Sequence, residues 1–114
     1  MKKTFIQTNE FSKRWDELKL SDDDLRKLEL LIIQKPHLGK VIRGTGGLRK
    51  IRLSLGSKGK SGGARVCYID FINLDTIYLI TIYRKKEKDN LSFGERNQIK
   101  KMILELEKSL NWRR

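Results

Sequence analysis

Two neighbouring apolar runs decide the fold of this chain: ARVCYIDFIN at residues 64–73 and TIYLITIYR at residues 76–84. Both are rich in β-branched and aromatic residues, which favours strands, and Leu74-Asp75 between them predicts a tight hairpin. Their nearly continuous hydrophobicity indicates that both faces of this strand pair are covered. We therefore expect the pair to form the centre of a sheet that packs against other elements on each side.

The sequence before this centre predicts one short strand and two helices. Thr4 to Gln7 is β-prone, and a first helix follows, with Asn9 as its expected N-cap and Phe11, Trp15 and Leu18 on its apolar face. Ser21 is expected to cap a second helix that ends before Pro36. This helix carries three carboxylates in its first turn and an apolar stripe made of Leu25, Leu28, Ile32 and Ile33. The short connection between the two helices predicts a helical hairpin.

The remaining elements complete an α+β pattern. Val41-Ile42 predicts a short extended piece, and Leu48 to Leu55 alternates as a strand that places Lys50, Arg52 and Ser54 on one face. A final helix is expected from about Ser92, which forms a capping-box pattern with Glu95, and its apolar stripe comprises Ile99, Met102, Ile103, Leu106 and Leu110. The predicted order is β-α-α-β-β-β-α. We expect a single domain over residues 1–114, with the helical hairpin and the C-terminal helix packed on a small antiparallel sheet.

Positive charge is concentrated in the middle of the chain. The formal net charge is +12, from 26 Lys and Arg against 14 Asp and Glu. Between Leu30 and Ile69 there is no acidic residue, but there are nine basic ones: Lys35, Lys40, Arg43, Arg49, Lys50, Arg52, Lys58, Lys60 and Arg65. Ordinary surfaces intersperse both signs. Such a field favours a polyanionic partner, and nucleic acid is the first candidate.

Several other kinds of site find little support. Cys67 and His37 are the only cysteine and histidine, so we interpret them as a small core residue and a surface loop residue, and we expect no metal site and no cofactor. Gly59-Lys60-Ser61 resembles the end of a P-loop, but Ser54 stands where that motif requires glycine. The N-terminus has no apolar signal-peptide region, and no run reaches the ~20 apolar residues of a membrane span. We expect a cytoplasmic protein that does not contact membranes.

The basic residues leave two functions open. Lys50 and Arg52 share a strand face, Arg65 begins the next strand beside the Lys58/Lys60 loop, and Arg84 and Lys85 end the last strand. These residues could form a binding surface for nucleic acid, or they could cut RNA without a metal. RNA carries its own nucleophile, the 2′-hydroxyl, so cleavage needs proton transfer and stabilisation of charge on the phosphorus. Arginine suits the second task, and a lysine among other cations can become a usable base.

The motifs resemble those of one known family. The segments are Pro36-x-x-Gly39-x-Val41-Ile42-x-GTGGLRKIR at residues 36–52, GKSGGARV at residues 59–66, Tyr83-x-Lys85, and Leu91-Ser92 before the last helix. Together they resemble the RelE/HigB-like toxins of the RelE/ParE superfamily over nearly the whole chain. The expected element order agrees with the fold that this resemblance implies.

The resemblance implies the toxin of a type II toxin–antitoxin pair that cleaves mRNA on the 70S ribosome without a metal. It implies catalytic roles for Lys50, Arg52, Arg65 and Lys85, and RNA or ribosome contacts by Arg49, Lys58, Lys60 and Arg84. The implied partner is a small antitoxin with a helix-turn-helix domain, through which alone DNA would be contacted. The alternatives are a ParE-like inhibitor of DNA gyrase and a non-catalytic RNA-binding module.

One stretch departs from the pattern of this family. Asn90-Leu91-Ser92 stands where several relatives carry a tyrosine or histidine, so the general acid is unassigned. Tyr83, another basic residue and the ribosome itself remain candidates for that role.

Overall fold

The computed structural model describes residues 3–55 and 63–110, which form a five-stranded sheet with helices on both faces. The strand order is β1-β5-β4-β3-β2. The elements in chain order are β1 (Thr4–Gln7), α1 (Asn9–Glu17), α2 (Asp22–Gln34), β2 (Lys40–Val41), β3 (Arg49–Leu53), β4 (Ala64–Phe71), a 3₁₀ turn (Ile72–Leu74), β5 (Thr76–Arg84) and α3 (Phe93–Ser109). The predicted α+β architecture is therefore confirmed, and the expected extended piece is the short strand β2.

The sheet is mixed, whereas we expected it to be antiparallel. β2, β3, β4 and β5 pair antiparallel, but β1 runs parallel to β5, with Thr4 opposite Thr76 and Gln7 opposite Leu79. Parallel neighbours need a long connection, and here the chain makes two helices and three strands between β1 and β5. The hydrophobic pattern of β1 indicates which of its faces is buried, but it does not indicate whether the strand runs parallel or antiparallel to its neighbour.

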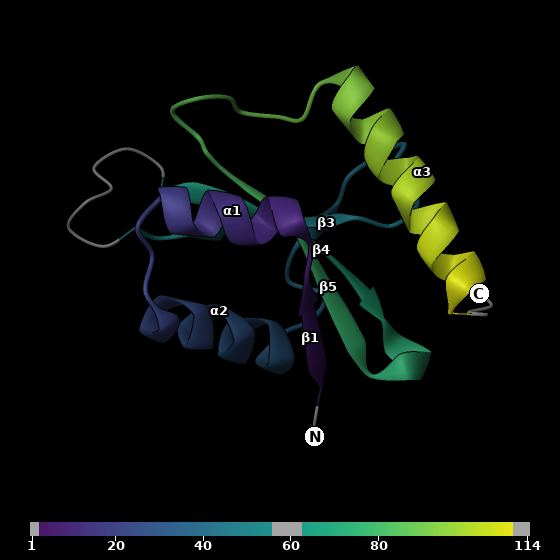
Figure 1. The fold of residues 1–114 in the computed structure, drawn as a ribbon, viewed down its shortest axis with the longest axis horizontal. Coiled ribbons are helices and arrows are strands. Elements are labelled where there is room, and N and C mark those ends of the chain that lie inside the picture. The colour runs from purple at the N-terminus through teal and green to yellow at the C-terminus, as the bar shows by residue number, and fades with distance from the viewer. Residues whose placement is uncertain (1–2, 56–62, 111–114) are drawn as a thin grey trace.

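Two apolar cores cover the sheet, as the continuous hydrophobicity of its central strands predicted. One face packs against α1 and α2 through residues that include Phe11, Trp15, Leu28 and Ile32. The other face packs against α3 through residues that include Ile99 and Ile103. Figure 1 shows α1 and α2 on one side of the sheet and α3 on the other. Among the described residues, no helix has the length and apolar content needed to cross a membrane.

The helix starts follow the predicted capping chemistry, with one correction. Ser21 and Ser92 cap α2 and α3 in complete capping boxes with Asp24 and Glu95. The N-cap of α1 is Thr8, not Asn9. The Thr8 hydroxyl accepts a hydrogen bond from the amide of Phe11 at 3.0 Å and donates one to the Ile80 carbonyl at 2.6 Å. Thr8 therefore ties the helix start to β5, a tertiary contact that outweighs the local preference for asparagine.

Two irregularities shape the central hairpin. β4 ends at Phe71, and the connection is longer than the predicted two-residue turn, with Asp75 in a left-handed conformation (φ 48°). A β-bulge also interrupts the pairing, because Cys67 lies opposite Thr81 and Tyr68 lies opposite Leu79. The extra residue resets the alternation of β5, so Ile82 joins the core under α1 and α2 while Tyr83 joins the core under α3.

Candidate active site

The strand β3 places two cations on one face of the sheet. Ile51 and Leu53 contribute to the core under α1 and α2, so Lys50 and Arg52, which alternate with them, project to the opposite face. The turn before β3 is fixed by Thr45, whose hydroxyl donates to the Ile42 carbonyl at 2.6 Å and accepts from the Leu48 amide at 3.1 Å.

Strand pairing brings further cations to this face. Lys40 of β2 lies opposite Lys50, and Arg65 of β4 lies opposite Arg52. Like charges directly opposite each other destabilise an antiparallel pair. Arg65 is also only 6% exposed, and its guanidinium donates to its neighbour's carbonyl, that of Ala64, at 3.2 Å. Burying a cation beside a second cation is unfavourable for folding, which is typical of positions kept for function.

Lys85 reaches the same region because the start of β4 lies close to the ends of β3 and β5. The Lys85 amide donates to the Gly63 carbonyl at 3.1 Å. Gly63 adopts a φ of +59°, and a Cβ atom there would clash with the Leu53 carbonyl oxygen. Only glycine satisfies both the left-handed backbone and this close approach.

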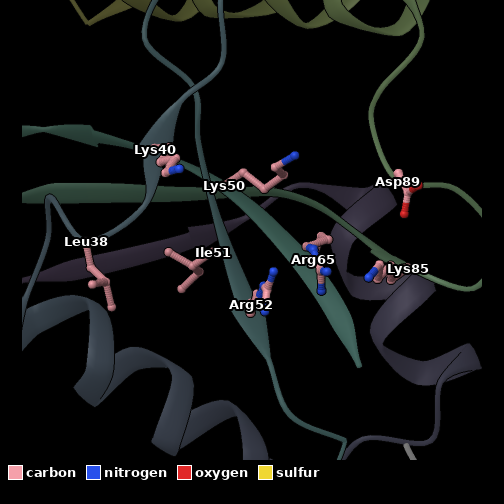
Figure 2. A pocket seen from close by; sticks show the side chains of 8 residues that line it. All are labelled: Leu38, Lys40, Lys50, Ile51, Arg52, Arg65, Lys85 and Asp89. Atoms are coloured by element: carbon pink, nitrogen blue, oxygen red, sulfur yellow. The ribbon is translucent and has the colours of Figure 1, made fainter. Parts of the chain in front are cut away.

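The four predicted catalytic residues line one cavity of about 540 Å³ (Figure 2). Its lining residues are Leu38, Lys40, Lys50, Ile51, Arg52, Arg65, Lys85 and Asp89. Five of these are cations, one is a carboxylate, and Leu38 and Ile51 add apolar surface. We call this cavity the cationic pocket. Its charge and size suit a phosphodiester with an adjoining sugar or base.

Two other predicted contact residues, Arg49 and Arg84, are not among the described residues that line the cationic pocket. The Arg49 guanidinium donates to the Gly39 carbonyl at 2.8 Å and holds the loop before β2. Arg84 lies on the opposite face, in a second pocket of about 450 Å³ with Arg14, Glu17 and Lys86 among its lining residues. Lys58 and Lys60 fall outside the described residues.

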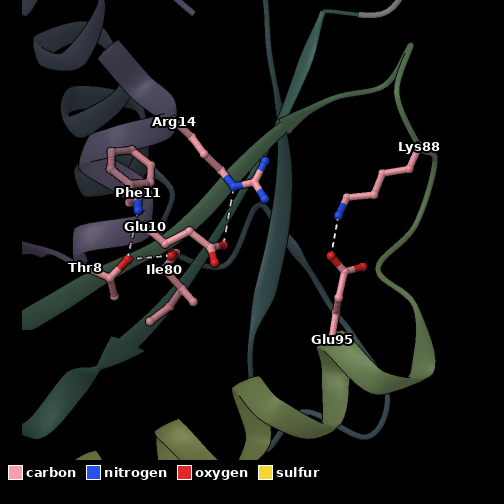
Figure 3. A network of polar contacts seen from close by, with 7 residues as sticks. All are labelled: Thr8, Glu10, Phe11, Arg14, Ile80, Lys88 and Glu95. Carbon is pink, nitrogen blue, oxygen red and sulfur yellow. Dashed lines mark hydrogen bonds and ion pairs between the residues drawn. The ribbon is translucent and has the colours of Figure 1, made fainter. Parts of the chain in front are cut away.

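The segment between β5 and α3 closes one end of the cationic pocket. The Lys50 ammonium donates to the Asn90 side-chain oxygen at 3.0 Å, and Leu91 is buried in the core under α3. Lys88 forms an ion pair with Glu95 (Figure 3) and lies 5.1 Å from the centre of the Tyr83 ring. The hydrogen bond from Lys88, followed by that from the Ser92 amide, lowers the pKa of Glu95.

Two groups considered for chemistry lie in the core. Burial raises the pKa of the Cys67 thiol to about 12, and Cys67 is fully enclosed, as its interpretation as a core residue predicted. Tyr83 is 2% exposed, burial raises its pKa, and it is not among the residues that line the cationic pocket. Its position therefore does not suit a proton donor for a substrate bound there.

Two charged pocket residues were missed by the sequence analysis, Lys40 and Asp89. Lys40 lies in the stretch without acidic residues. Its place in the pocket, however, depends on the two-residue pairing of β2 with β3, which the sequence does not predict. Asp89 follows a largely basic stretch. It is acidic, whereas the site was predicted from basic residues alone. His37 is exposed in a loop, as expected. Within residues 3–55 and 63–110, no group of three or more His, Cys, Asp or Glu side chains could hold a metal ion.

Comparison with known proteins identifies the fold. No family model matches the sequence. The structure is similar to that of a free-state mutant of the E. coli toxin RelE in which two arginines are replaced by alanine, with a TM-score of 0.59 and 19% identity over 86% of this chain and 97% of that chain. It is similar to isolated E. coli RelE, with a TM-score of 0.54 and 18% identity over 89% and 99% of the two chains.

A third similar structure is the intact E. coli RelBE toxin–antitoxin complex, with a TM-score of 0.54 and 20% identity over 73% of this chain and 96% of that chain. The chain therefore has the RelE-like toxin fold.

Proposed function

We propose that this protein is the toxin of a type II toxin–antitoxin pair and that it cleaves mRNA on the ribosome without a metal. The observation that carries the proposal is the convergence of Lys50, Arg52, Arg65 and Lys85 on one cavity. These residues come from three separate segments of the chain: β3, β4 and the position directly after β5. The RelE-like fold supports the assignment to toxins.

The charge arrangement favours chemistry over simple binding. A surface that only binds RNA can use exposed, flexible lysines that are well separated, because such side chains cost little folding free energy. Here Arg65 is nearly buried and lies opposite Arg52, so two guanidinium groups face the same small volume. Cations held in that way are positioned to stabilise charge that develops during a reaction.

The proposed reaction uses the 2′-hydroxyl of RNA as its nucleophile. Loss of the hydroxyl proton lets the O2′ atom attack the adjacent phosphorus, and a phosphorane with an additional negative charge forms. The P–O5′ bond then breaks, leaving a 2′,3′-cyclic phosphate and a 5′-hydroxyl end. Lys50 and Arg52 would assist deprotonation by stabilising the developing alkoxide, and Arg65 with Lys85 would hold the phosphate oxygens.

The partners follow from the same proposal. A domain with a net charge of +12 would bind the 70S ribosome and its mRNA through phosphate contacts. A similar fold occurs in a solved toxin–antitoxin complex, which supports a cognate antitoxin as the second partner. An antitoxin that neutralises this protein should present acidic and apolar residues, and we expect it to carry the helix-turn-helix domain that contacts DNA.

A matched pair of arginine variants tests the nuclease function. Arg52→Ala removes an exposed cation from the pocket, and Arg26→Ala removes an exposed cation of α2 that is not among the pocket-lining residues. Ribosomes programmed with a defined message are mixed with purified protein, and the RNA ends are mapped. We expect Arg52→Ala to reduce the cleavage rate roughly 10²–10³-fold and Arg26→Ala to leave it unchanged.

The cleavage assay, together with an RNA-binding and a gyrase supercoiling measurement, separates the alternatives. If the wild type binds RNA but produces no new ends, the protein is a binding module. If it produces no ends and instead blocks supercoiling by purified gyrase, the ParE-like alternative is correct.

A further inference from the structure

One lining residue of the cationic pocket has no role in the reaction described above. Asp89 is the only acidic residue among the described residues that line the pocket, and the other charged lining residues are Lys40, Lys50, Arg52, Arg65 and Lys85. Figure 2 shows Asp89 on the segment after β5, at the end of the pocket where Lys85 lies. A carboxylate repels phosphate, so in a pocket that binds RNA it must instead meet a hydroxyl or an N–H group.

The residues on both sides of Asp89 are anchored. On one side, the Lys88 ammonium forms an ion pair with Glu95, and the Lys88 backbone amide donates a hydrogen bond to the Arg84 carbonyl at 3.2 Å. On the other side, the Asn90 side-chain oxygen accepts the hydrogen bond from Lys50 at 3.0 Å, and Leu91 is 6% exposed. These contacts hold the backbone of Asp89 at the rim of the pocket.

The Asp89 carboxylate itself is open. Asp89 is exposed, and no hydrogen bond or ion pair joins its side chain to another residue in the described part of the chain. Its oxygens are therefore free to accept a proton from a bound substrate.

The chemistry of the pocket singles out this residue. Arginine and charged lysine side chains are hydrogen-bond donors without an acceptor lone pair. Among the described side chains that line the pocket, the Asp89 carboxylate is the only one that offers free lone pairs to a hydroxyl proton. The cations around it lower the energy of an alkoxide, but they cannot remove its proton while they remain charged.

Resting on the proposed ribonuclease function, we propose that Asp89 is the general base of the reaction and that Asn90 positions its segment through the bond to Lys50. The 2′-hydroxyl proton moves to an Asp89 oxygen as the O2′–phosphorus bond forms. When the P–O5′ bond breaks, its electron pair stays on O5′, which takes a proton from a pocket ammonium group. Exchange with water then deprotonates Asp89 and reprotonates the amine.

Asp89→Asn tests this role because the amide keeps the shape and one acceptor oxygen but is not a base. Asp16→Asn is the control, since it makes the same charge change at an exposed position of α1. In single-turnover cleavage on programmed ribosomes, we expect a loss of roughly 10²–10⁴-fold for Asp89→Asn, partial recovery for Asp89→Glu, and no loss for the control. RNA affinity of Asp89→Asn should be unchanged or tighter, because a negative charge is lost from a phosphate-binding pocket.

A second substrate separates a base from an acid. A message with a sulfur atom in place of the bridging O5′ has a leaving group that needs no proton. If Asp89 is the base, Asp89→Asn remains slow on this message relative to the wild type. Restoration of the rate by sulfur would place Asp89 on the leaving-group side and overturn the proposal.

The other outcomes are also decisive. Wild-type rates for Asp89→Asn, with or without a changed preference for the neighbouring bases, would reject the role of Asp89 as base. A wild type that cleaves no message would reject the proposed function itself, which distinguishes the two failures.

Discussion

At the scale of single residues, Arg52 and Arg65 are held against their mutual repulsion. They are direct cross-strand partners, and both line the cationic pocket. The predicted alternation of β3 identified Arg52 and Lys50 as a pair on one face, and the structure places them there. The sequence could not reveal the opposition of Arg52 and Arg65, because it depends on the register between β3 and β4.

This opposition predicts that Arg52→Ala stabilises the protein. Removing one of two like charges across a strand pair should raise the free energy of unfolding by roughly 0.2–1 kcal/mol at low salt. The gain should shrink when salt screens the repulsion. Urea unfolding of wild type and variant at low and high ionic strength measures it. A variant less stable than the wild type at low salt would mean that Arg52 makes a favourable contact that outweighs the repulsion.

At the scale of elements, the sequence correctly predicted the starts of α2 and α3 and the bounds of β5, but not the N-cap of α1 or the direction of β1. The capping boxes at Ser21 and Ser92 are local patterns within four residues, so the sequence contains them completely. β5 is bounded as predicted, because its apolar run is long and continuous. Three features depend on contacts between distant segments. They are the parallel pairing of β1, the use of Thr8 and not Asn9 as the N-cap of α1, and the bulge near Cys67.

The start of α3 makes stability depend on pH through Glu95. The pKa of Glu95 is lowered by the hydrogen bonds from Lys88 and the Ser92 amide. Because the folded pKa lies below the unfolded one, this stabilisation is present above the unfolded pKa and is lost as pH falls through the folded pKa. Glu95→Gln should therefore reduce stability at neutral pH and lose less on acidification than the wild type. Thermal unfolding followed from about pH 7 to pH 3 measures this, and equal acid sensitivity of the two proteins would contradict it.

The junction of β3, β4 and β5 depends on a single glycine. Gly63→Ala should destabilise the fold because its methyl group would meet the Leu53 carbonyl, and it should reduce cleavage by moving Lys85. Gly44→Ala is the matched control, since Gly44 also has a positive φ (+79°) but nothing lies within 4 Å of the added atom. Backbone strain alone costs about 1–3 kcal/mol. Denaturant unfolding should show a larger loss at position 63 than at position 44, and equal losses would refute the steric argument.

At the scale of the whole molecule, the fold brings five cations from separate segments of the chain to one pocket and places other basic residues elsewhere. The charge pattern predicted a basic site, and Lys50, Arg52, Arg65 and Lys85 do line one cavity. Arg84 lies on the other face and Arg49 holds a loop, because strand alternation and local carbonyls, not charge, determine where each side chain points. Lys40 lines the pocket through the pairing of β2 with β3, and Asp89 lines it through the segment after β5, so only the tertiary structure reveals them as pocket residues.

The central claim is that these cations cut translated messages, and induced expression tests it most directly. Cells expressing the wild type, Arg65→Ala or Arg26→Ala are followed for growth, and mRNA 5′ ends are mapped across the transcriptome. We predict growth arrest with new ends inside translated reading frames for the wild type and for Arg26→Ala, and neither for Arg65→Ala at equal protein levels. Arrest by the wild type without new mRNA ends would contradict the claim.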